Sequence, residues 1–497
     1  MAKQSAKMNK PAYSVLVVDL DETLVATDTL LESVLLFLKL HPLSFFLLFV
    51  WLLKGKSYFK DQLAQRVCPD PATLPYRQKV LEYIGKAKAS GTPVILATAS
   101  HRRIAAGVAE HLGLFSDVLA SDAQTNLSGQ RKLKAILAQT GQKPFAYIGD
   151  SAVDIPLWEA ADTAVIVDPS TKLMKRLKAH PKVSLLLSEH RNRKLRTWIE
   201  AIRMHQWAKN LLLFVSPIIA QRIVEPGFFL LLILAFISMS FIASSSYLLN
   251  DLFDLGDDRL HRKKKKRPLA SGRVSIKQAF FLMSALLITS YLIAFLFLPL
   301  QFLLFLCIYL ILTFLYSFVL KQKILVDTVV LAGLYTFRVI IGAVAVQMLV
   351  SSWLLAFSMF FFLSLALMKR YSELLKTPES VLKIPGRGYQ RGDNETVMVS
   401  GIASGQISLL VFSLYMDSDR MREFYGTPHV FWLILPVLFY WLTRMWLLAH
   451  RGEMSEDPIL FTIKDSISYV SLLIIALLFI ISTLKVTSLY PFQFLIP

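Results

Sequence analysis

The sequence predicts a chain of two parts: an N-terminal α/β domain with a doubly wound parallel sheet, then an all-α domain that crosses a membrane about nine times. Over roughly the first 170 residues, short apolar runs alternate with helical stretches, as in a parallel sheet with crossover helices. Beyond residue 207, apolar segments of about 20 residues follow one another, which is the length of a spanning helix. Hydrophobic residues make up 55% of the 497 residues, and the mean hydropathy is +0.51. Such a chain is too apolar for an ordinary soluble protein.

The α/β domain is expected over residues 11–170. Residues 28–90 are inserted after its first strand, and within them Leu43–Leu53 is almost wholly apolar. Eleven residues are too few to span a bilayer, so we expect a buried helix there; the alternative is a helix resting on the membrane surface. The four predicted strands end in loop residues and are Ser14–Val18, Pro93–Ala97, Phe145–Ile148 and Ala164–Val167.

A basic stretch, residues 171–200, follows the α/β domain and carries nine Lys or Arg between Lys172 and Arg196. We expect a linker that lies on anionic lipid headgroups or forms a solvated basic surface. The membrane domain is expected over residues 201–490, and the first of its segments is the weakest because it is short and ends at Arg222. The nine predicted spans are about 207–223, 228–249, 277–295, 297–319, 325–347, 352–368, 397–416, 429–448 and 467–485.

Loop charge predicts the orientation of these spans. With the N-terminal domain in the cytoplasm, the loops on its side carry about 18 Lys or Arg and those on the other side about 4. We therefore expect a multi-pass protein of the inner (plasma) membrane with its chemistry on the cytoplasmic face. The net charge of +19 fits such a face better than nucleic-acid binding, and the distant Cys68 and Cys307 exclude a disulfide framework.

Carboxylates and cations at the strand ends of the α/β domain suit phosphoryl transfer. Asp19 and Asp21 leave the first strand in the same direction, so Asp19 can attack phosphorus and Asp21 can protonate the leaving oxygen. Thr98 ends the second strand and offers a hydroxyl to a phosphate, which Lys132 or Lys134 can neutralise. The segment Gly149–Asp154 adds two carboxylates, Asp150 and Asp154, for Mg²⁺. In a doubly wound sheet these positions meet at one crevice.

This set resembles the haloacid dehalogenase-like (HAD) phosphatase superfamily over roughly residues 11–170. The resemblance implies that Asp19 is the nucleophile, Asp21 the acid/base and Thr98 the phosphate binder. It also implies that Lys132 is the lysine of the family's third motif, with Lys134 as its rival, and that residues 28–90 are the substrate-selecting cap. The Mg²⁺ ligands it implies are Asp19, Asp21, Asp150 and Asp154. A degenerate copy of such a domain, kept for docking, is the alternative.

An acidic helix end follows the second apolar segment. Asp251, Asp254 and Asp258 are spaced i, i+3, i+7 and share one helix face, which Asn250 flanks. Grouped carboxylates repel each other and are costly near lipid, and Mg²⁺ bound to a diphosphate would relieve both penalties. The alternative is a solvated acidic helix end. The basic run Arg259–Arg267 comes next, so carboxylates can hold the metal while cations hold phosphates, although some of these lysines serve as a positive-inside anchor.

These motifs resemble the UbiA superfamily of intramembrane prenyl-transfer enzymes over about residues 200–490, and more narrowly its decaprenyl-phosphate phosphoribosyltransferase branch. Arg203–Asn210 is similar to the entry motif of that branch, as is Asp258–His261 running on to Arg267–Gly272. Arg262 departs from the pattern, which often has proline there. The resemblance adds Asn250 as a metal ligand and implies these substrate-binding residues: Lys209, Asn250, Arg259, His261, Lys264, Arg267, Tyr316, Lys321, Lys369, Arg370 and Glu373.

The loop after the sixth span distinguishes between two possible functions, prenyl transfer and phosphoribosyl transfer. Aromatic prenyltransferases of the superfamily carry a second aspartate-rich DxxxD motif there, but Lys369–Glu395 is mostly basic and polar. One metal cluster with many cations fits phosphoribosyl pyrophosphate as donor and polyprenyl phosphate as acceptor. The expected function is therefore Mg²⁺-dependent transfer of 5-phosphoribosyl, with the phosphatase domain removing the 5-phosphate of the product. Prenyl transfer to an aromatic or quinone-type acceptor is the alternative, and a transporter or lipid-binding protein is a third.

Overall fold

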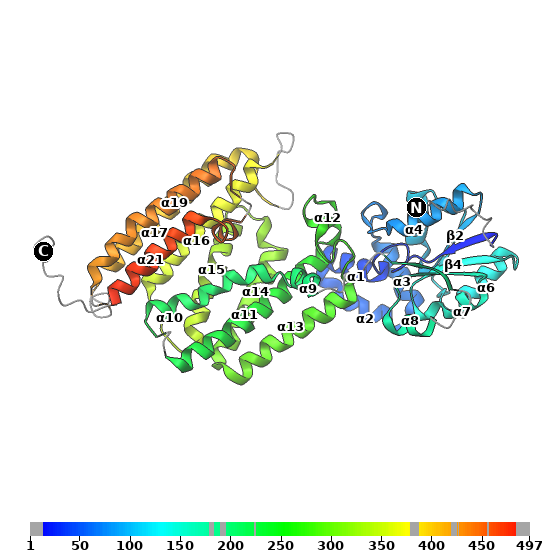
Figure 1. The fold of residues 1–497 in the computed structure, drawn as a ribbon, viewed down its shortest axis with the longest axis horizontal. Coiled ribbons are helices and arrows are strands. Elements are labelled where there is room, and N and C mark those ends of the chain that lie inside the picture. The colour runs from blue at the N-terminus through cyan, green and yellow to red at the C-terminus, as the bar shows by residue number, and fades with distance from the viewer. Residues whose placement is uncertain are drawn as a thin grey trace, which may run out of the picture. The chain divides into compact units, whose positions relative to one another are not determined.

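The computed structural model describes residues 13–177, 183–188, 195–222, 225–377, 387–418, 425, 427–454 and 457–483. The chain divides into two compact units (Figure 1). The first contains Met1–Met204 together with Tyr247–Ser284, and the second contains His205–Ser246 together with Ala285–Pro497. The boundary therefore assigns residues 250–267, called here the aspartate-rich loop, and the ends of the two flanking helices to the same unit as the α/β domain.

A parallel sheet of strand order β3-β2-β1-β4-β5-β6 forms the centre of the first unit. The predicted α/β class is confirmed, because two helices pack on one face through Val80, Ile84 and Ile104, and others pack on the second face through Ile136 and Trp158. The strands are β1 Val15–Val18, β2 Val94–His101, β3 Asp117–Ser121, β4 Phe145–Gly149, β5 Thr163–Val167 and β6 Val183–Leu187. The helices are α4 Gln78–Ala89 and α5 Arg102–Leu112 on the first face, and α6 Gln130–Thr140, α7 Ile155–Ala160 and α8 Thr171–Leu177 on the second.

Two predicted boundaries of this domain need correction. β6 pairs with β5 in parallel, so part of the predicted linker 171–200 belongs to the sheet. The apolar, β-prone sequence of β6 adds it to the edge of the sheet despite its basic neighbours in the chain. The predicted cap, 28–90, is also too long, because α4 packs on the sheet through Val80 and Ile84.

The inserted cap consists of α1 Thr29–Leu40, the 3₁₀ turn Pro42–Ser44, α2 Phe45–Leu53 and α3 Lys56–Arg66. The prediction that Leu43–Leu53 is a buried helix is wrong. Trp51 is the buried residue of α2, whereas Phe49 is 66% and Leu53 88% exposed. A nine-residue helix packed on one side leaves its other faces uncovered, and this helix is apolar on every face.

Residues 247–284 complete the first unit. They include the end of α11 Pro226–Phe253, the short helix α12 Leu255–Leu260, and the beginning of α13 Ile276–Phe297. Gly272 lies between α12 and α13 with φ +71°, and a Cβ there would be 2.5 Å from the Cβ of Ala26. Glycine therefore permits this loop to approach the loop that follows β1.

The second unit is helical, and eight helices in the described residues are long and apolar enough to cross a membrane. They are α11, α13, α14 Leu300–Phe318, α15 Val326–Ala345, α16 Ser352–Leu375, α17 Asn394–Met416, α19 Ile434–His450 and α21 Ser466–Thr483, and the spans of α17 and α19 include the 3₁₀ turns before them, from Arg391 and His429. The predicted first span, 207–223, is not a regular α-helix. It is instead the 3₁₀ helix η4 Met204–Phe214 followed by the short helix α10 Val215–Ile219, so the expected nine spanning α-helices become eight.

η4 lies antiparallel to α11. The Trp207 indole donates a hydrogen bond to the Ser244 hydroxyl at 2.9 Å, and the Asn210 amide donates to the Ser240 hydroxyl at 3.0 Å. Farther along, the rings of Phe214 and Phe236 are 6.0 Å apart. A 3₁₀ helix of eleven residues is uncommon because its hydrogen-bond geometry is poorer, so it requires such tertiary support.

Candidate functional site

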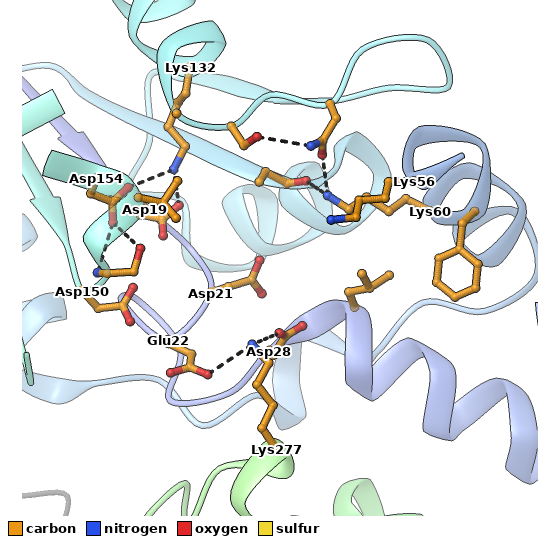
Figure 2. A pocket seen from close by; sticks show the side chains of 18 of the residues that line it. Asp19, Asp21, Glu22, Asp28, Lys56, Lys60, Lys132, Asp150, Asp154 and Lys277 are labelled. Carbon is orange, nitrogen blue, oxygen red and sulfur yellow. Dashed lines mark hydrogen bonds and ion pairs between the residues drawn. The ribbon is translucent and has the colours of Figure 1, made fainter. Parts of the chain in front are cut away.

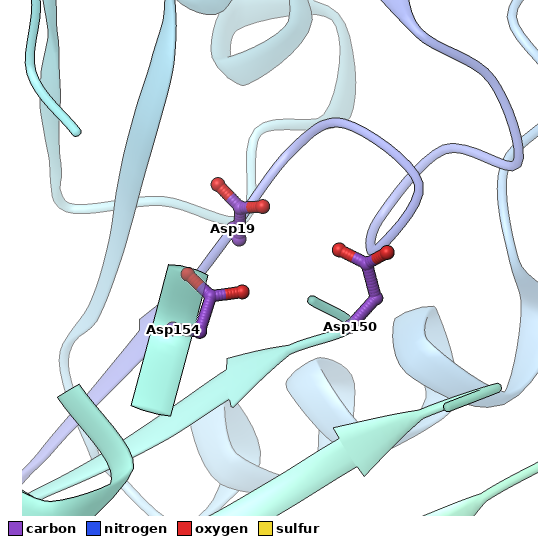
Figure 3. A group of neighbouring side chains, drawn as sticks. All are labelled: Asp19, Asp150 and Asp154. Atoms are coloured by element: carbon purple, nitrogen blue, oxygen red, sulfur yellow. The ribbon is translucent and has the colours of Figure 1, made fainter. Parts of the chain in front are cut away.

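Three carboxylates meet at the carboxyl edge of the sheet in the first unit (Figure 3). Asp19 follows β1, while Asp150 and Asp154 follow β4, the neighbouring parallel strand. One oxygen from each lies within 4.8 Å of the others. Oxygen ligands in such a group suit Mg²⁺, and the mutual repulsion of three carboxylates is relieved by a divalent cation.

Lys132 is the cation of this cluster. Its ammonium group lies 2.8 Å from Asp19 Oδ1 and 3.8 Å from Asp154 Oδ1. It also donates a hydrogen bond to the Tyr147 hydroxyl at 3.0 Å, and that hydroxyl donates to Asp154 at 2.9 Å. Lys134 is exposed on the same helix, so the structure selects Lys132 from the two predicted lysines. Tyr147 lies within the buried strand β4, and no motif in the sequence marks it for a polar role.

The electrostatics of the cluster depend on burial. Burial raises the pKa of Asp19 to about 7, opposed by Lys132 and reinforced by Asp154. Burial, with Asp19 and Asp154 nearby, raises the pKa of Asp150 to about 8. Carboxylates that resist ionisation in each other's presence are typical of a site made to hold a cation.

Asp21 lies outside the group of three. Its carboxylate accepts hydrogen bonds from the Thr29 N–H at 2.7 Å and from the Ser100 hydroxyl. Burial and the nearby Asp28 raise its pKa, which suits a proton donor better than a metal ligand. Thr98 is fully buried, and its hydroxyl accepts from the Ser100 N–H at 3.0 Å, so it positions Ser100 and the loop beside Asp21.

A cavity of about 610 Å³ opens in front of these residues (Figure 2). Three lysines that the sequence reasoning did not select line it: Lys56 and Lys60 from α3, and Lys277 from the first turn of α13. Lys60 donates to the Ala99 carbonyl at 2.6 Å and to Asn126 Oδ1 at 2.7 Å. Lys277 forms an ion pair with Asp28 at 2.9 Å. These lysines are far from Asp19 and Asp21 in the sequence, so no local motif connects them with those aspartates. The fold places them around the same cavity.

The aspartate-rich loop also lies in the first unit, but its carboxylates are divided. Asp251 and Asp258 both face Arg267, whose Nη1 is 3.1 Å from one and 2.5 Å from the other, and Arg203 pairs with Asp251. Asp254 instead lies 3.3 Å from the ammonium group of Lys39. The prediction of one continuous helical face is wrong, because α11 ends at Phe253 and Asp254, with φ −99° and ψ 15°, is the non-helical residue between α11 and α12.

The basic residues of this loop have different surroundings. Arg259 is buried against Glu32 of α1, so it stabilises the loop rather than facing a substrate. Lys264 is exposed and lies 3.8 Å from Asp258. The exposed His261 accepts hydrogen bonds at Nδ1 from the backbone of Lys263 and Lys264. Asn250 accepts, through its carbonyl, the N–H of Asp254 at 2.9 Å.

In the second unit, two predicted lysines lie close to the carboxylate of Asp457, which was not predicted as a site residue. Lys209 of η4 lies 2.7 Å from Asp457, and Lys369 of α16 lies 3.7 Å from it. Burial raises the pKa of Asp457, but Lys209 and Lys369 outweigh it and lower that pKa to about 2. Asp457 precedes Pro458 at the start of α20 Pro458–Thr462 and caps that helix. An aspartate before a proline is typical of a helix N-cap, so the sequence does not suggest a binding role for it.

Arg370 and Glu373 form a structural network rather than an open site. Arg370 is fully buried, pairs with Glu373 and lies 2.6 Å from the buried Asp327. Tyr389 also donates to Asp327, at 2.7 Å. Tyr316 and Lys321, the remaining predicted residues, lie at the edge of this network. Arg387 lies 3.4 Å from both the Tyr316 hydroxyl and the carbonyl of Lys321.

The UbiA prenyltransferase family model matches residues 211–467, just over half of the chain. The chain belongs to the UbiA prenyltransferase family. The haloacid dehalogenase-like hydrolase model matches residues 16–159, which contain the cluster of Asp19, Asp150 and Asp154. Both parts of this UbiA family member thus belong to enzyme families, and the resemblances stated from the sequence are confirmed.

One relative matches both parts of the chain, and others match less of it. The uncharacterized protein y4nM of Sinorhizobium fredii is 36% identical over 91% of this chain and 88% of its own length. Nodulation protein NoeC of Azorhizobium caulinodans is 32% identical over 56% of this chain and 91% of its own. Decaprenyl-phosphate phosphoribosyltransferase of Mycobacterium tuberculosis is 34% identical over 180 residues, which are 35% of this chain and 59% of that enzyme.

Solved structures resemble each part separately. A structure of digeranylgeranylglyceryl phosphate synthase is 17% identical with a TM-score of 0.43, covering 59% of this chain and 99% of that chain. Phosphoserine phosphatase is 15% identical with a TM-score of 0.24, covering 35% of this chain and 93% of that chain.

Proposed function

We propose that the membrane domain transfers 5-phosphoribosyl from phosphoribosyl pyrophosphate to polyprenyl phosphate. The observation that carries this proposal is the 34% identity to decaprenyl-phosphate phosphoribosyltransferase over 180 residues. The basic loop after α16, which lacks a DxxxD sequence, supports a phosphosugar donor over an allylic diphosphate. The lipid phosphate oxygen attacks the anomeric carbon, the bond to the diphosphate breaks, and the diphosphate leaves.

The aspartate-rich loop would bind the leaving diphosphate. Asp251 and Asp258 face a common point, now bridged by Arg267, and would hold Mg²⁺ there. The metal supplies positive charge to the diphosphate as it leaves. Arg203 and Arg267 are then the cations nearest the phosphates. An apolar cavity of about 250 Å³ in the second unit, lined by Phe357, Phe361 and Phe412 among others, can accommodate part of a prenyl tail.

We propose that the HAD domain then hydrolyses the 5-phosphate of this lipid product. Asp19 attacks phosphorus, the bond to the ribose oxygen breaks, and Asp21 gives that oxygen a proton. Water then hydrolyses the aspartyl phosphate. Lys132 neutralises Asp19 and the phosphate, and Mg²⁺ held by Asp19, Asp150 and Asp154 supplies charge stabilisation when bound. The loop charges favour the cytoplasmic face of the inner membrane for both steps.

The proposal is tested with purified protein in liposomes containing polyprenyl phosphate. One reaction receives Mg²⁺ and labelled phosphoribosyl pyrophosphate; a parallel one receives an allylic diphosphate and hydroxybenzoate. Label in the lipid of the first reaction alone supports phosphoribosyl transfer. A prenylated hydroxybenzoate in the second, with no labelled lipid in the first, contradicts it and favours the alternative prenyl transfer.

A further inference from the structure

The cap of the phosphatase domain carries an apolar surface that the catalytic steps do not use. Helices α1 and α2 form a hairpin bent by 120° around the 3₁₀ turn Pro42–Ser44. The inner side packs on a small core of Phe37, Trp51, Phe59, Leu63 and Val67. The outer side exposes large apolar residues, each more than 40% exposed: Leu40, Leu43, Phe45, Phe46, Phe49, Val50, Leu52 and Leu53. Contiguous apolar surface of this kind marks an interaction site.

We infer that this hairpin inserts its α2 side into the cytoplasmic leaflet of the bilayer and so presents the phosphatase cavity to a phosphomonoester lipid. The inference rests on the proposed phosphatase step for its substrate, while insertion itself rests on the observations below.

The charges around the hairpin fit an anionic lipid surface. No Asp or Glu occurs between Glu32 and Asp61, and the exposed Lys54 and Lys56 come directly after α2. Apolar residues that enter the acyl region and lysines that remain at the headgroups are typical of an interfacial helix. A nine-residue α2 is too short to span a bilayer, so it would lie within one leaflet.

The root of the hairpin is held to a membrane helix of the same unit. Asp28 caps the N-terminus of α1 and forms the ion pair with Lys277, the second residue of α13. Ile276–Phe297 is one of the candidate spans. Leu52 in the last turn of α2 and Lys277 line the same cavity, so the exposed helix and the start of the span are within one cavity's width. A bilayer around α13 is therefore close to α2, which favours lipid over a soluble protein as its partner.

The cavity connects this surface with the catalytic carboxylates. Leu30, Leu52 and Phe59 form its apolar part on the cap side, and Asp19 lies in its wall with Lys56, Lys60 and Lys277. A substrate that keeps its tail in the leaflet and extends an anionic head toward Asp19 matches both parts of this lining. The chemical class is a phosphomonoester joined to a lipid, rather than a soluble metabolite.

Insertion is tested on the full chain in liposomes that contain anionic lipid. In a Cys68→Ser, Cys307→Ser background, a single cysteine is introduced by Phe49→Cys and labelled with a polarity-sensitive fluorophore. Lys143→Cys is the matched control, because Lys143 is exposed and precedes β4, at the opposite edge of the sheet from Asp150. Lipids with a quencher in the acyl chain should quench the label at 49 and leave the label at 143 unquenched. Equal quenching at both positions, or a label at 49 shielded from water but not quenched, overturns the inference.

A second measurement tests the substrate class. The double variant Phe49→Ser, Leu53→Ser should lower kcat/KM for 5-phosphoribosyl polyprenyl phosphate in vesicles by about tenfold or more, because two apolar anchors are lost. Hydrolysis of the water-soluble p-nitrophenyl phosphate should change by less than about twofold, since neither residue lines the cavity. An equal loss on both substrates overturns the substrate class. If the label at 49 is quenched but wild-type protein does not hydrolyse the vesicle lipid, insertion is upheld and the proposed phosphatase step is wrong.

Discussion

Arg259 donates hydrogen bonds to both carboxylate oxygens of Glu32, at 3.0 and 2.6 Å, across 227 residues of sequence. Both side chains are buried, with 7% and 8% of their surface exposed. Glu32 lies on α1 of the cap and Arg259 on α12 of the aspartate-rich loop. The two segments therefore belong to one folded unit, although one comes from the phosphatase sequence and the other from the UbiA sequence.

Removing one partner of this pair should destabilise the first unit. Glu32→Ala leaves the Arg259 guanidinium buried without its carboxylate, which typically costs about 3–5 kcal/mol. Thermal unfolding in detergent should show a clear fall in Tm. Arg222→Ala is the control, because its pair with Glu225 is exposed and such pairs contribute about 0–1 kcal/mol. Equal Tm values for the two variants would show that the buried pair is not important for stability.

Asp19→Asn should separate the two proposed activities. The amide cannot attack phosphorus, so the phosphorylated sugar lipid should accumulate while the transfer rate stays unchanged. Thin-layer chromatography of labelled lipid distinguishes this product from the dephosphorylated lipid of the wild type. Identical lipids from both proteins would remove the coupled reaction and leave the transferase proposal standing alone.

Asp258→Asn should abolish transfer without unfolding the protein. Loss of a carboxylate from a divalent-cation site removes several kcal/mol of charge stabilisation. Asp257→Asn is the matched control in the same loop, because Asp257 points to solvent and pairs with Lys39. The label-transfer assay should show near wild-type activity for Asp257→Asn. Similar activity in Asp258→Asn would refute the metal assignment.

The basic residues near α16 should divide into two groups. Lys209→Ala and Lys369→Ala should raise the KM for the phosphosugar donor more than that for the lipid, since a charge-assisted hydrogen bond contributes about 1.5–3 kcal/mol. Arg370→Ala should instead lower Tm, because it leaves the fully buried Asp327 without its arginine. Steady-state kinetics and thermal unfolding on the same preparations test this division. An Arg370→Ala protein with wild-type Tm and a raised donor KM would place Arg370 in the donor site.

The α/β fold and its catalytic group were predictable because they depend on local pattern. Apolar strands followed by carboxylates identify Asp19 and Asp150 at one edge of a parallel sheet, and the structure brings them together. Lys132 and Lys134 could not be separated by composition, since both are lysines on one helix. Helical phase decides between them, because one turns to the sheet and the other to solvent.

What the sequence did not reveal depends on distant partners. Arg259 appeared free to bind phosphate because nothing local shows that Glu32 reaches it. Asp254 was placed with Asp251 and Asp258 on the assumption of an unbroken helix, but Lys39 pairs with it at the break. The exposure of α2 was missed because a fully apolar segment of a soluble domain is normally buried. The apolar pattern does not show that, in the described structure, protein covers only the Trp51 side of this helix.

The 3₁₀ helix η4 has a consequence for which terminus faces which compartment. The α/β domain and residues 247–284 form one unit and must lie on the same side of the bilayer, although α11 crosses it between them. The chain must therefore cross once more before α11. At about 2.0 Å per residue for η4 and 1.5 Å for α10, Met204–Ile219 extends about 30 Å, the thickness of the hydrocarbon core. If the eight candidate spans of the described chain also cross, the total is nine, so we expect Thr483 at the end of α21 in the compartment opposite the phosphatase. Reporter proteins fused to the two termini should accordingly be active in opposite compartments.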